Sequence, residues 1–317
     1  LVPVLIMTYY AVIGGWILRY IVIYLTSSGK QAVADNCFTS FISSPSSVWY
    51  GLIFMFLTAL IVYNGVEKGI ERVSKFIMPV LLIMVIGIAI FSLTLKTTLD
   101  DGTVRTGLQG LKVYMKPDLT GITIGRFLQI TLDAMSQLFF SLSVSMGIMI
   151  TYGSYVKKDV DLNKAVSQIE IMDTGVAFLA GVMIIPAVFV FSGLDGMSAG
   201  PGLMFVYLVN VFNGMPGGKI VGIVFYICVL FAGMSSLVNL YEAPVATMQE
   251  KFGLKRPAAV GVIAAIGCIV GLAIQGIVSG WMDAVSIYIC PLGAMLAGIM
   301  FFWVAGKDFA LEAVNQG

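Results

Sequence analysis

The sequence predicts an all-α polytopic membrane protein that crosses the bilayer about eight times. Hydrophobic residues make up 59% of the 317 residues and charged residues only 11%, whereas soluble domains carry about 25% charged residues. The mean hydropathy is +0.97. The apolar residues form runs of roughly 20, the length at which a helix spans the hydrocarbon core of a bilayer. Polar connectors separate these runs.

The expected helices follow directly from these apolar runs. In chain order they span residues 2–25, 48–63, 76–95, 127–155, 171–191, 220–247, 258–274 and 284–304. A long polar loop joins the third helix to the fourth. The segment at 192–219 is too rich in Gly and Pro to span, yet too apolar for a plain solvated loop. It is therefore expected to form a re-entrant or lid-like external loop.

Basic residues set the expected orientation of the helices. Alternate connectors carry the lysines and arginines, and cytoplasmic connectors are the ones enriched in these residues. The chain is thus expected to be a multi-pass protein of the cell inner (plasma) membrane. The residues that place these connectors in the cytoplasm are Lys68, Arg72, Lys75, Lys157, Lys158, Lys164, Lys251, Lys255, Arg256 and Lys307.

Composition argues against several functional classes. The chain contains no histidine, which excludes a His-liganded metal site, a Ser-His-Asp triad and a histidine proton relay. No nucleophile–base motif is present, so a membrane-embedded enzyme is the weaker hypothesis. The net charge is +1 and no basic block suggests nucleic acid. The four scattered cysteines have neither metal-ligand spacing nor the pattern of a disulfide framework: Cys37, Cys228, Cys268 and Cys290.

The apolar pattern breaks between residues 137 and 155. Ser141, Ser143 and Ser145 alternate with Leu142 and Val144, and a glycine follows at 147. Alternate residues cannot share one face of a helix, and Ser and Gly both weaken helices. A helix interrupted here, at 141–147, would leave free backbone groups that could bind a cation or zwitterion. On composition alone, a continuous helix with serines bonded to their own carbonyls is favoured, because Ser and Gly are common in membrane helices.

The stretch FFSLSVSMGIMITYGSYV (139–156) resembles the broken sixth helix of the neurotransmitter:sodium symporter family, in its bacterial amino-acid branch. That family has the leucine-transporter (LeuT) fold. Further segments resemble its third, seventh, eighth and tenth helices and its fourth-to-fifth connector. They are TYYAVIGGW, MDTGVAFLAGVMIIPAVF, FAGMSSLVNLYEAPVA, WMDAVSIYICPLGA and NGVEKGIERVSKFIMPVL. The resemblance covers the family's helices three to ten.

This resemblance implies a sodium-coupled symporter of amino acids that works by alternating access, with the amino acid, sodium and the bilayer as its partners. In the family's inverted repeat, residues 1–95 form three helices of the first repeat. Residues 96–126 form an external loop, and residues 127–317 supply the five helices of the second repeat. The chain opens at Leu1 inside an apolar run, and no segment resembles the family's first helix. A truncated fragment without sodium-dependent uptake is therefore expected, an inert remnant being the alternative.

Sodium prefers hard oxygen ligands, and the resemblance assigns two sodium sites. Ser141 and Asp173 belong to the first, while the carbonyl of Ala232 and the hydroxyls of Ser235 and Ser236 belong to the second. On the residues alone, the serine pair could equally be a helix-packing feature. Asp173 could be a helix-start residue stabilised by the helix dipole. The resemblance instead implies that this carboxylate replaces chloride, which makes chloride unnecessary.

The resemblance also implies a substrate pocket. The Tyr10 hydroxyl would bind the substrate carboxylate, while Ser143 and the carbonyls of Phe140 and Ser141 would bind its ammonium group. Phe140 would cover the substrate, and Asp283 would act with it as an external gate. The residues expected around the substrate side chain are Ile6, Met146, Ser236, Asn239 and Leu240. Met146 stands where phenylalanine is frequent, which favours a larger hydrophobic or aromatic amino acid, while Asn239 leaves room for a polar one.

Overall fold

A computed structural model of the chain describes residues 1–27, 30–33, 36–64, 70–99, 102–116, 118–144, 146–153, 156, 160–198, 200 and 202–315. The first half contains α1 (Val2–Ser27), a 3-10 turn (Lys30–Val33), α2 (Cys37–Ile42), α3 (Pro45–Asn64), α4 (Ile70–Thr94), β1 (Lys96–Thr98), β2 (Val104–Thr106), α5 (Gly107–Met115), α6 (Ile124–Ser141) and α7 (Ile148–Gly153). The second half contains α8 (Leu162–Ser192), a 3-10 turn (Asp195–Ser198), α9 (Gly202–Gly214), α10 (Gly218–Phe252), α11 (Arg256–Ala273), a 3-10 turn (Gln275–Ile277), α12 (Val278–Asp283), a π-helical turn (Ala284–Ile289), α13 (Cys290–Ile299), a second π-helical turn (Met300–Val304) and α14 (Lys307–Asn315).

Within these described residues, seven helices are long and apolar enough to cross a membrane. They are Val2–Ser27, Pro45–Tyr63, Lys75–Thr94, Leu162–Ser192, Gly218–Phe252, Arg256–Ala273 and Gln275–Val304. The fourth expected helix, at 127–155, is divided into two pieces, α6 and α7, as the resemblance to the family's broken helix predicted. The prediction of an all-α polytopic membrane protein is confirmed.

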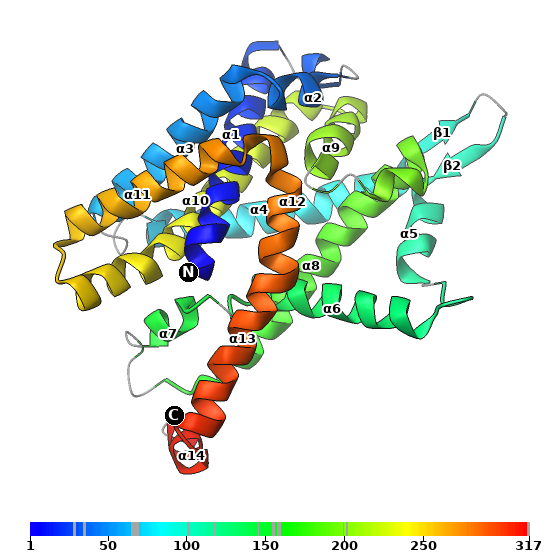
Figure 1. Ribbon diagram of the computed structural model, residues 1–317. Helices are drawn as coiled ribbons and strands as arrows, with labels where there is room; N and C mark the ends of the chain where they lie inside the picture. Colours follow the sequence, from blue (N-terminus) through cyan, green and yellow to red (C-terminus); the bar gives the residue numbers. More distant parts are fainter. Residues whose placement is uncertain are drawn as a thin grey trace.

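Helix α1 is enclosed by other helices (Figure 1), and it packs against α3, α10 and α11. Ile6, Met7 and Tyr20 are completely buried. At Gly15, an added Cβ would lie 2.4 Å from the backbone nitrogen of Gly51 in α3. Glycine therefore permits direct contact between the two helix backbones, and any side chain here would separate them.

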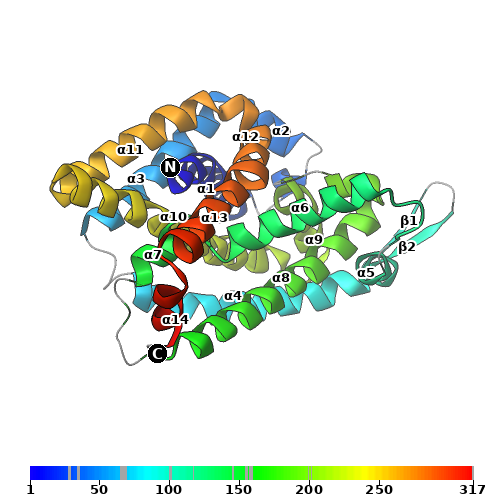
Figure 2. The same cartoon turned by 60° about the horizontal axis from the view of Figure 1, so that its bottom comes forward.

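A second layer is formed by α4, α8 and α5. Figure 2 shows α4 and α8 running side by side, with α5 at one end of the pair. The loop before α6 is more ordered than its polar composition suggested. Strands β1 and β2 form an antiparallel hairpin, and Thr106 begins α5 with a capping box to Gln109. Each residue satisfies a backbone donor of the other that would otherwise be unpaired.

The fifth membrane helix begins earlier than predicted. The apolar run suggested a start near residue 171, but α8 begins at Leu162. The carboxylate of Asp161 accepts a hydrogen bond of 3.0 Å from the backbone N–H of Lys164 and caps the helix. The first turns of α8 are polar and exposed, so the helix extends beyond its apolar part, where hydropathy gives no signal.

The Gly- and Pro-rich segment at 192–219 contains a buried helix. Phe205, Leu208 and Phe212 of α9 have no exposed surface, and α9 packs against α8 and α10. At 13 residues, α9 is too short to cross a bilayer. This agrees with the expectation that the segment does not span, while its role as a lid stays a prediction.

Candidate substrate and sodium site

The broken helix provides the backbone of the candidate site. Helix α6 ends at Ser141 and α7 begins at Ile148, while Ser145 lies outside the described residues. Ser143 has φ +54° and Gly147 has φ +71°. Both values lie in the left-handed region, where a helix cannot continue. Backbone groups between α6 and α7 are thus released from regular helical hydrogen bonding.

A cavity of about 270 Å³ lies beside this break, between α1, α6, α7 and α10. Nine residues expected to bind the substrate all line it: Ile6, Tyr10, Phe140, Ser141, Ser143, Met146, Ser236, Asn239 and Leu240. Gln137 and Ile148 also line it and were missed by the sequence analysis. Gln137 lies one helical turn before Ser141, so helical spacing could have identified it. Ile148 carries no signal that separates it from other apolar residues.

The walls of the cavity differ in chemistry. Ile6, Met146 and Leu240 are at most 4% exposed and provide an apolar lining. Polar groups lie among them, and the Tyr10 hydroxyl is within hydrogen-bonding reach of Ser236. A mostly apolar pocket with a few placed polar groups is the usual form of a small-molecule site.

A hydrogen bond joins the end of α6 to α8. The hydroxyl of Ser141 donates to a carboxylate oxygen of Asp173 at 2.6 Å. These residues are 32 positions apart and were both expected at the first sodium site. The contact places a carboxylate and a hydroxyl, two hard oxygen ligands, at the edge of the cavity.

The position of Asp173 excludes the alternative that it is a helix-start residue. Helix α8 is capped by Asp161, and Asp173 lies eleven residues after the first helical residue, Leu162. The effect of the helix dipole falls off within the first turn. The helix-start interpretation is therefore wrong, because it assumed that the helix begins with its apolar run.

The residues expected at the second sodium site lie in the middle of α10. The hydroxyl of Ser235 donates to the carbonyl of Ala232 at 2.8 Å. Ser236 instead faces the cavity. The three oxygens thus lie within little more than one helical turn.

The two expected gate residues are separated in the structure. Phe140 is partly buried and lines the cavity. Asp283 is exposed at the C-terminal end of α12, just before the π-helical turn, and does not line the cavity. Of these two residues, only Phe140 therefore lies beside the candidate substrate cavity.

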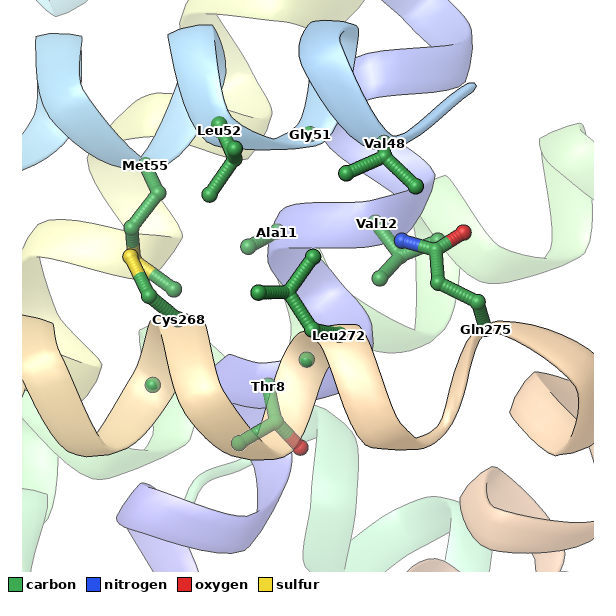
Figure 3. Close-up of a pocket in the computed structure, with 12 residues that line it drawn as sticks. Thr8, Ala11, Val12, Val48, Gly51, Leu52, Met55, Cys268, Leu272 and Gln275 are labelled. Atoms are coloured by element: carbon green, nitrogen blue, oxygen red, sulfur yellow. The ribbon is translucent and has the colours of Figure 1, made fainter. Parts of the chain in front are cut away.

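A much smaller space lies elsewhere, between α1, α3 and α11 (Figure 3). Its volume is about 20 Å³, enough for about one water molecule. Thr8 and the amide of Gln275 are its main polar groups, and no charged residue lines it. It is too small and too apolar to serve as the amino-acid site.

A partly buried ion pair lies near the C-terminal end of α10. Glu242 accepts two hydrogen bonds from the guanidinium of Arg256, at 3.0 and 2.8 Å. The same guanidinium donates to the carbonyl of Val62 at the end of α3. This arrangement connects α3, α10 and α11.

Comparison with known proteins agrees with this geometry. Residues 37–308 match the model of the sodium:neurotransmitter symporter family. The chain is 38% identical over 261 residues to the uncharacterized sodium-dependent transporter YhdH of Bacillus subtilis, covering 80% of this chain and 53% of the relative. It is 30% identical to a similar transporter, MJ1319, of Methanocaldococcus jannaschii, covering 98% of this chain and 66% of the relative. The chain thus spans about half to two thirds of the length of these relatives.

A solved structure shows the same fold. The crystal structure of MhsT in complex with L-phenylalanine superposes with a TM-score of 0.86 at 35% identity, covering 99% of this chain and 72% of MhsT. This match over nearly the whole chain confirms the expected LeuT-type multi-pass fold. The chain belongs to the sodium:neurotransmitter symporter family.

Proposed function

We propose that the gene product containing this chain is a sodium-coupled symporter of hydrophobic or aromatic amino acids in the cell inner membrane. The observation that carries the proposal is the 270 Å³ cavity, which the broken helix lines together with Tyr10 and Ser236. Its volume is near the lower end of the roughly 300–1,000 Å³ of small-molecule pockets, which suits one amino acid. The related MhsT was crystallised with L-phenylalanine.

In this proposal the zwitterion lies along the break. The substrate ammonium is bound by Ser143 and the carbonyls of Phe140 and Ser141, and its carboxylate by the Tyr10 hydroxyl. Phe140 covers the substrate. The apolar residues Ile6, Met146 and Leu240 contact its side chain, while Ser236 and Asn239 supply polar contacts. Buried polar groups of the site are satisfied by the substrate, which makes recognition selective.

Two sodium ions couple transport to the ion gradient. The first is bound by Ser141 and Asp173, whose side chains are 2.6 Å apart, and the second by Ala232, Ser235 and Ser236. A fixed carboxylate beside the first ion offsets its charge at short range in a medium of low dielectric constant. External chloride is accordingly not required.

The domain organisation follows the inverted repeat. Residues 1–95 belong to the first repeat, residues 96–126 form an external loop, and residues 127–317 form the second repeat with its lid at about 192–219. Asp283 and Phe140 control access from the outside. Alternating access then proceeds by movement of one repeat against the other around the site.

Uptake of labelled phenylalanine into liposomes tests the proposal, with the full-length gene product and an inward gradient of sodium or potassium. We expect uptake with sodium only. Met146→Ala should raise the KM for phenylalanine roughly tenfold, because it removes an apolar wall of the pocket. Met149→Ala is the matched control, since Met149 is 43% exposed and does not line the cavity. Uptake that is indifferent to sodium, or equal effects of the two substitutions, would contradict the proposal.

A further inference from the structure

A second concave surface, of about 530 Å³, lies between β2, α5 and the C-terminal end of α8, with walls distinct from those of the substrate cavity. Its charged lining residues are all cations: Arg105, Lys112 and Lys116. Its apolar lining residues are Val104, Val113 and Phe189. A surface that combines positive charge with exposed apolar side chains fits an anionic amphiphile.

The fold holds this surface in place. Gln109, Lys112, Val113 and Lys116 follow the spacing of one helix face and line the surface together. The opposite face of α5 packs on α8, where an added Cβ at Gly110 would lie 2.7 Å from the Cα of Pro186. The cationic face of α5 is thus directed away from the protein interior.

The three cations have no anionic partner among the described residues. Lys112 and Lys116 lie four residues apart, a spacing at which like charges repel and weaken a helix. Of the nearby acids, Asp118 accepts hydrogen bonds from Thr120. Asp100 and Asp101 lie outside the described residues. The helix dipole favours a cation at the C-terminal end of α5, which accounts for one lysine there. It does not account for Arg105, which lies in β2.

The surface adjoins the end of a helix that is long and apolar enough to cross a membrane. Phe189 is three residues before the end of this helix, α8, at Ser192, about 4.5 Å along the axis. The ends of membrane-spanning helices lie near the lipid head groups. Basic side chains near the membrane surface attract anionic lipids.

We propose that this surface binds an anionic phospholipid. The lipid phosphate is bound by Arg105, Lys112 and Lys116, and the first part of an acyl chain lies along Val113 and Phe189. Guanidinium and ammonium groups are the usual partners of phosphate. The lipid would hold the hairpin and α5 against α8 without taking part in the substrate site.

Native mass spectrometry of the purified full-length gene product tests this proposal, with added phosphatidylglycerol or phosphatidylcholine. We expect phosphatidylglycerol to bind more tightly. The double variant K112Q/K116Q should bind it roughly ten- to thirtyfold more weakly. The matched variant R126Q/K219Q removes the same charge from exposed positions outside the surface and should bind as the unmodified protein does.

Equal binding of the two lipids, or equal loss in both double variants, would overturn the proposal. A thermal unfolding scan checks that both variants keep the fold. Competition with sn-glycerol 3-phosphate separates the two sources of a phosphate group. If this soluble ester displaces phosphatidylglycerol at comparable concentration, the surface is a soluble-anion site and the lipid assignment is wrong.

Discussion

Helices α1 and α6 both line the candidate substrate cavity, but they are held very differently. In α1, Ile6, Met7 and Tyr9 are at most 1% exposed, because other helices surround them. In α6, Ser136 is the only buried residue, whereas Leu128 is 61% and Leu138 is 52% exposed. Tyr10 thus lies on a fixed wall, and the residues of the broken helix lie on a wall with few protein contacts.

Two polar contacts tie α6 to the rest of the molecule. The hydroxyl of Ser136 donates to the carbonyl of Ile287 in the π-helical turn at 3.2 Å, and Ser141 donates to Asp173. Segments with few buried contacts open at low cost in free energy. Within this chain, α6 and α7 are therefore held by fewer buried contacts than α1.

The largest expected effect is a loss of stability on substitution in the tightly packed helix α1. Gly15→Ala should lower the free energy of unfolding by about 3 kcal/mol, because the added methyl meets the backbone of α3 rather than a flexible side chain. Gly125→Ala in α6 is the control, since nothing lies within 4 Å of its added Cβ. That substitution should be neutral or stabilising by about 0.5–1 kcal/mol. Thermal unfolding in detergent measures both, and equal effects would remove the distinction between the two walls.

The next effect concerns the contact between α6 and α8. Asp173→Asn should weaken sodium binding by about 2 kcal/mol, or roughly thirtyfold, because it removes a charged ligand. Uptake in chloride-free buffer should fall accordingly, and added chloride should restore part of it. Asp133→Asn is the control, since Asp133 is exposed on α6 and bonds only to Gln129 among the contacts described. Normal uptake by Asp173→Asn with and without chloride would show that this carboxylate binds no ion.

The same contrast explains which parts of the fold were predictable from sequence. Membrane helices were found because the length of an apolar run is a local property. The polar start of α8 was missed because a helix that extends past its apolar run gives no hydropathy signal. The hairpin of β1 and β2 was missed because each strand has only three residues. The buried helix α9 is defined by its packing against distant helices.

The candidate site was less predictable from the sequence than the membrane helices were. The alternating serines raised the possibility of a break, but only the resemblance to the family's broken helix favoured it over a continuous helix. The meeting of Ser141 with Asp173 could not be derived from spacing, because it depends on how α6 crosses α8. Only the resemblance to a known family placed these two residues at one site. The same holds for Tyr10 and Ser236, which are far apart in the sequence.

A smaller effect is expected at the break itself. Ser143 has φ +54°, and this left-handed conformation costs a non-glycine residue about 1–2 kcal/mol. Ser143→Gly should therefore stabilise the fold by about 1 kcal/mol while lowering substrate affinity roughly tenfold, since the hydroxyl is lost. Ser143→Ala loses the same hydroxyl but keeps the strain, so it should lose affinity without gaining stability. If the Ser143→Gly and Ser143→Ala variants unfold at the same temperature, the left-handed conformation at position 143 does not destabilise the fold.

The smallest effect is on a thiol beside the packed wall. Burial raises the pKa of Cys37, and the positive charge of Arg19 offsets only part of that shift. Since the thiolate is the reactive form, a membrane-impermeant maleimide should label Cys37 from outside more slowly than a cysteine introduced by Leu119→Cys. Leu119 is 68% exposed in the loop before α6. Raising the pH should narrow the difference between the two labelling rates, because more of the Cys37 thiol ionises.

A cysteine introduced by Lys255→Cys, on the predicted cytoplasmic side, should not react at all. External labelling at that position would overturn the topology, and equal rates at the first two positions would show that close packing does not extend to α2.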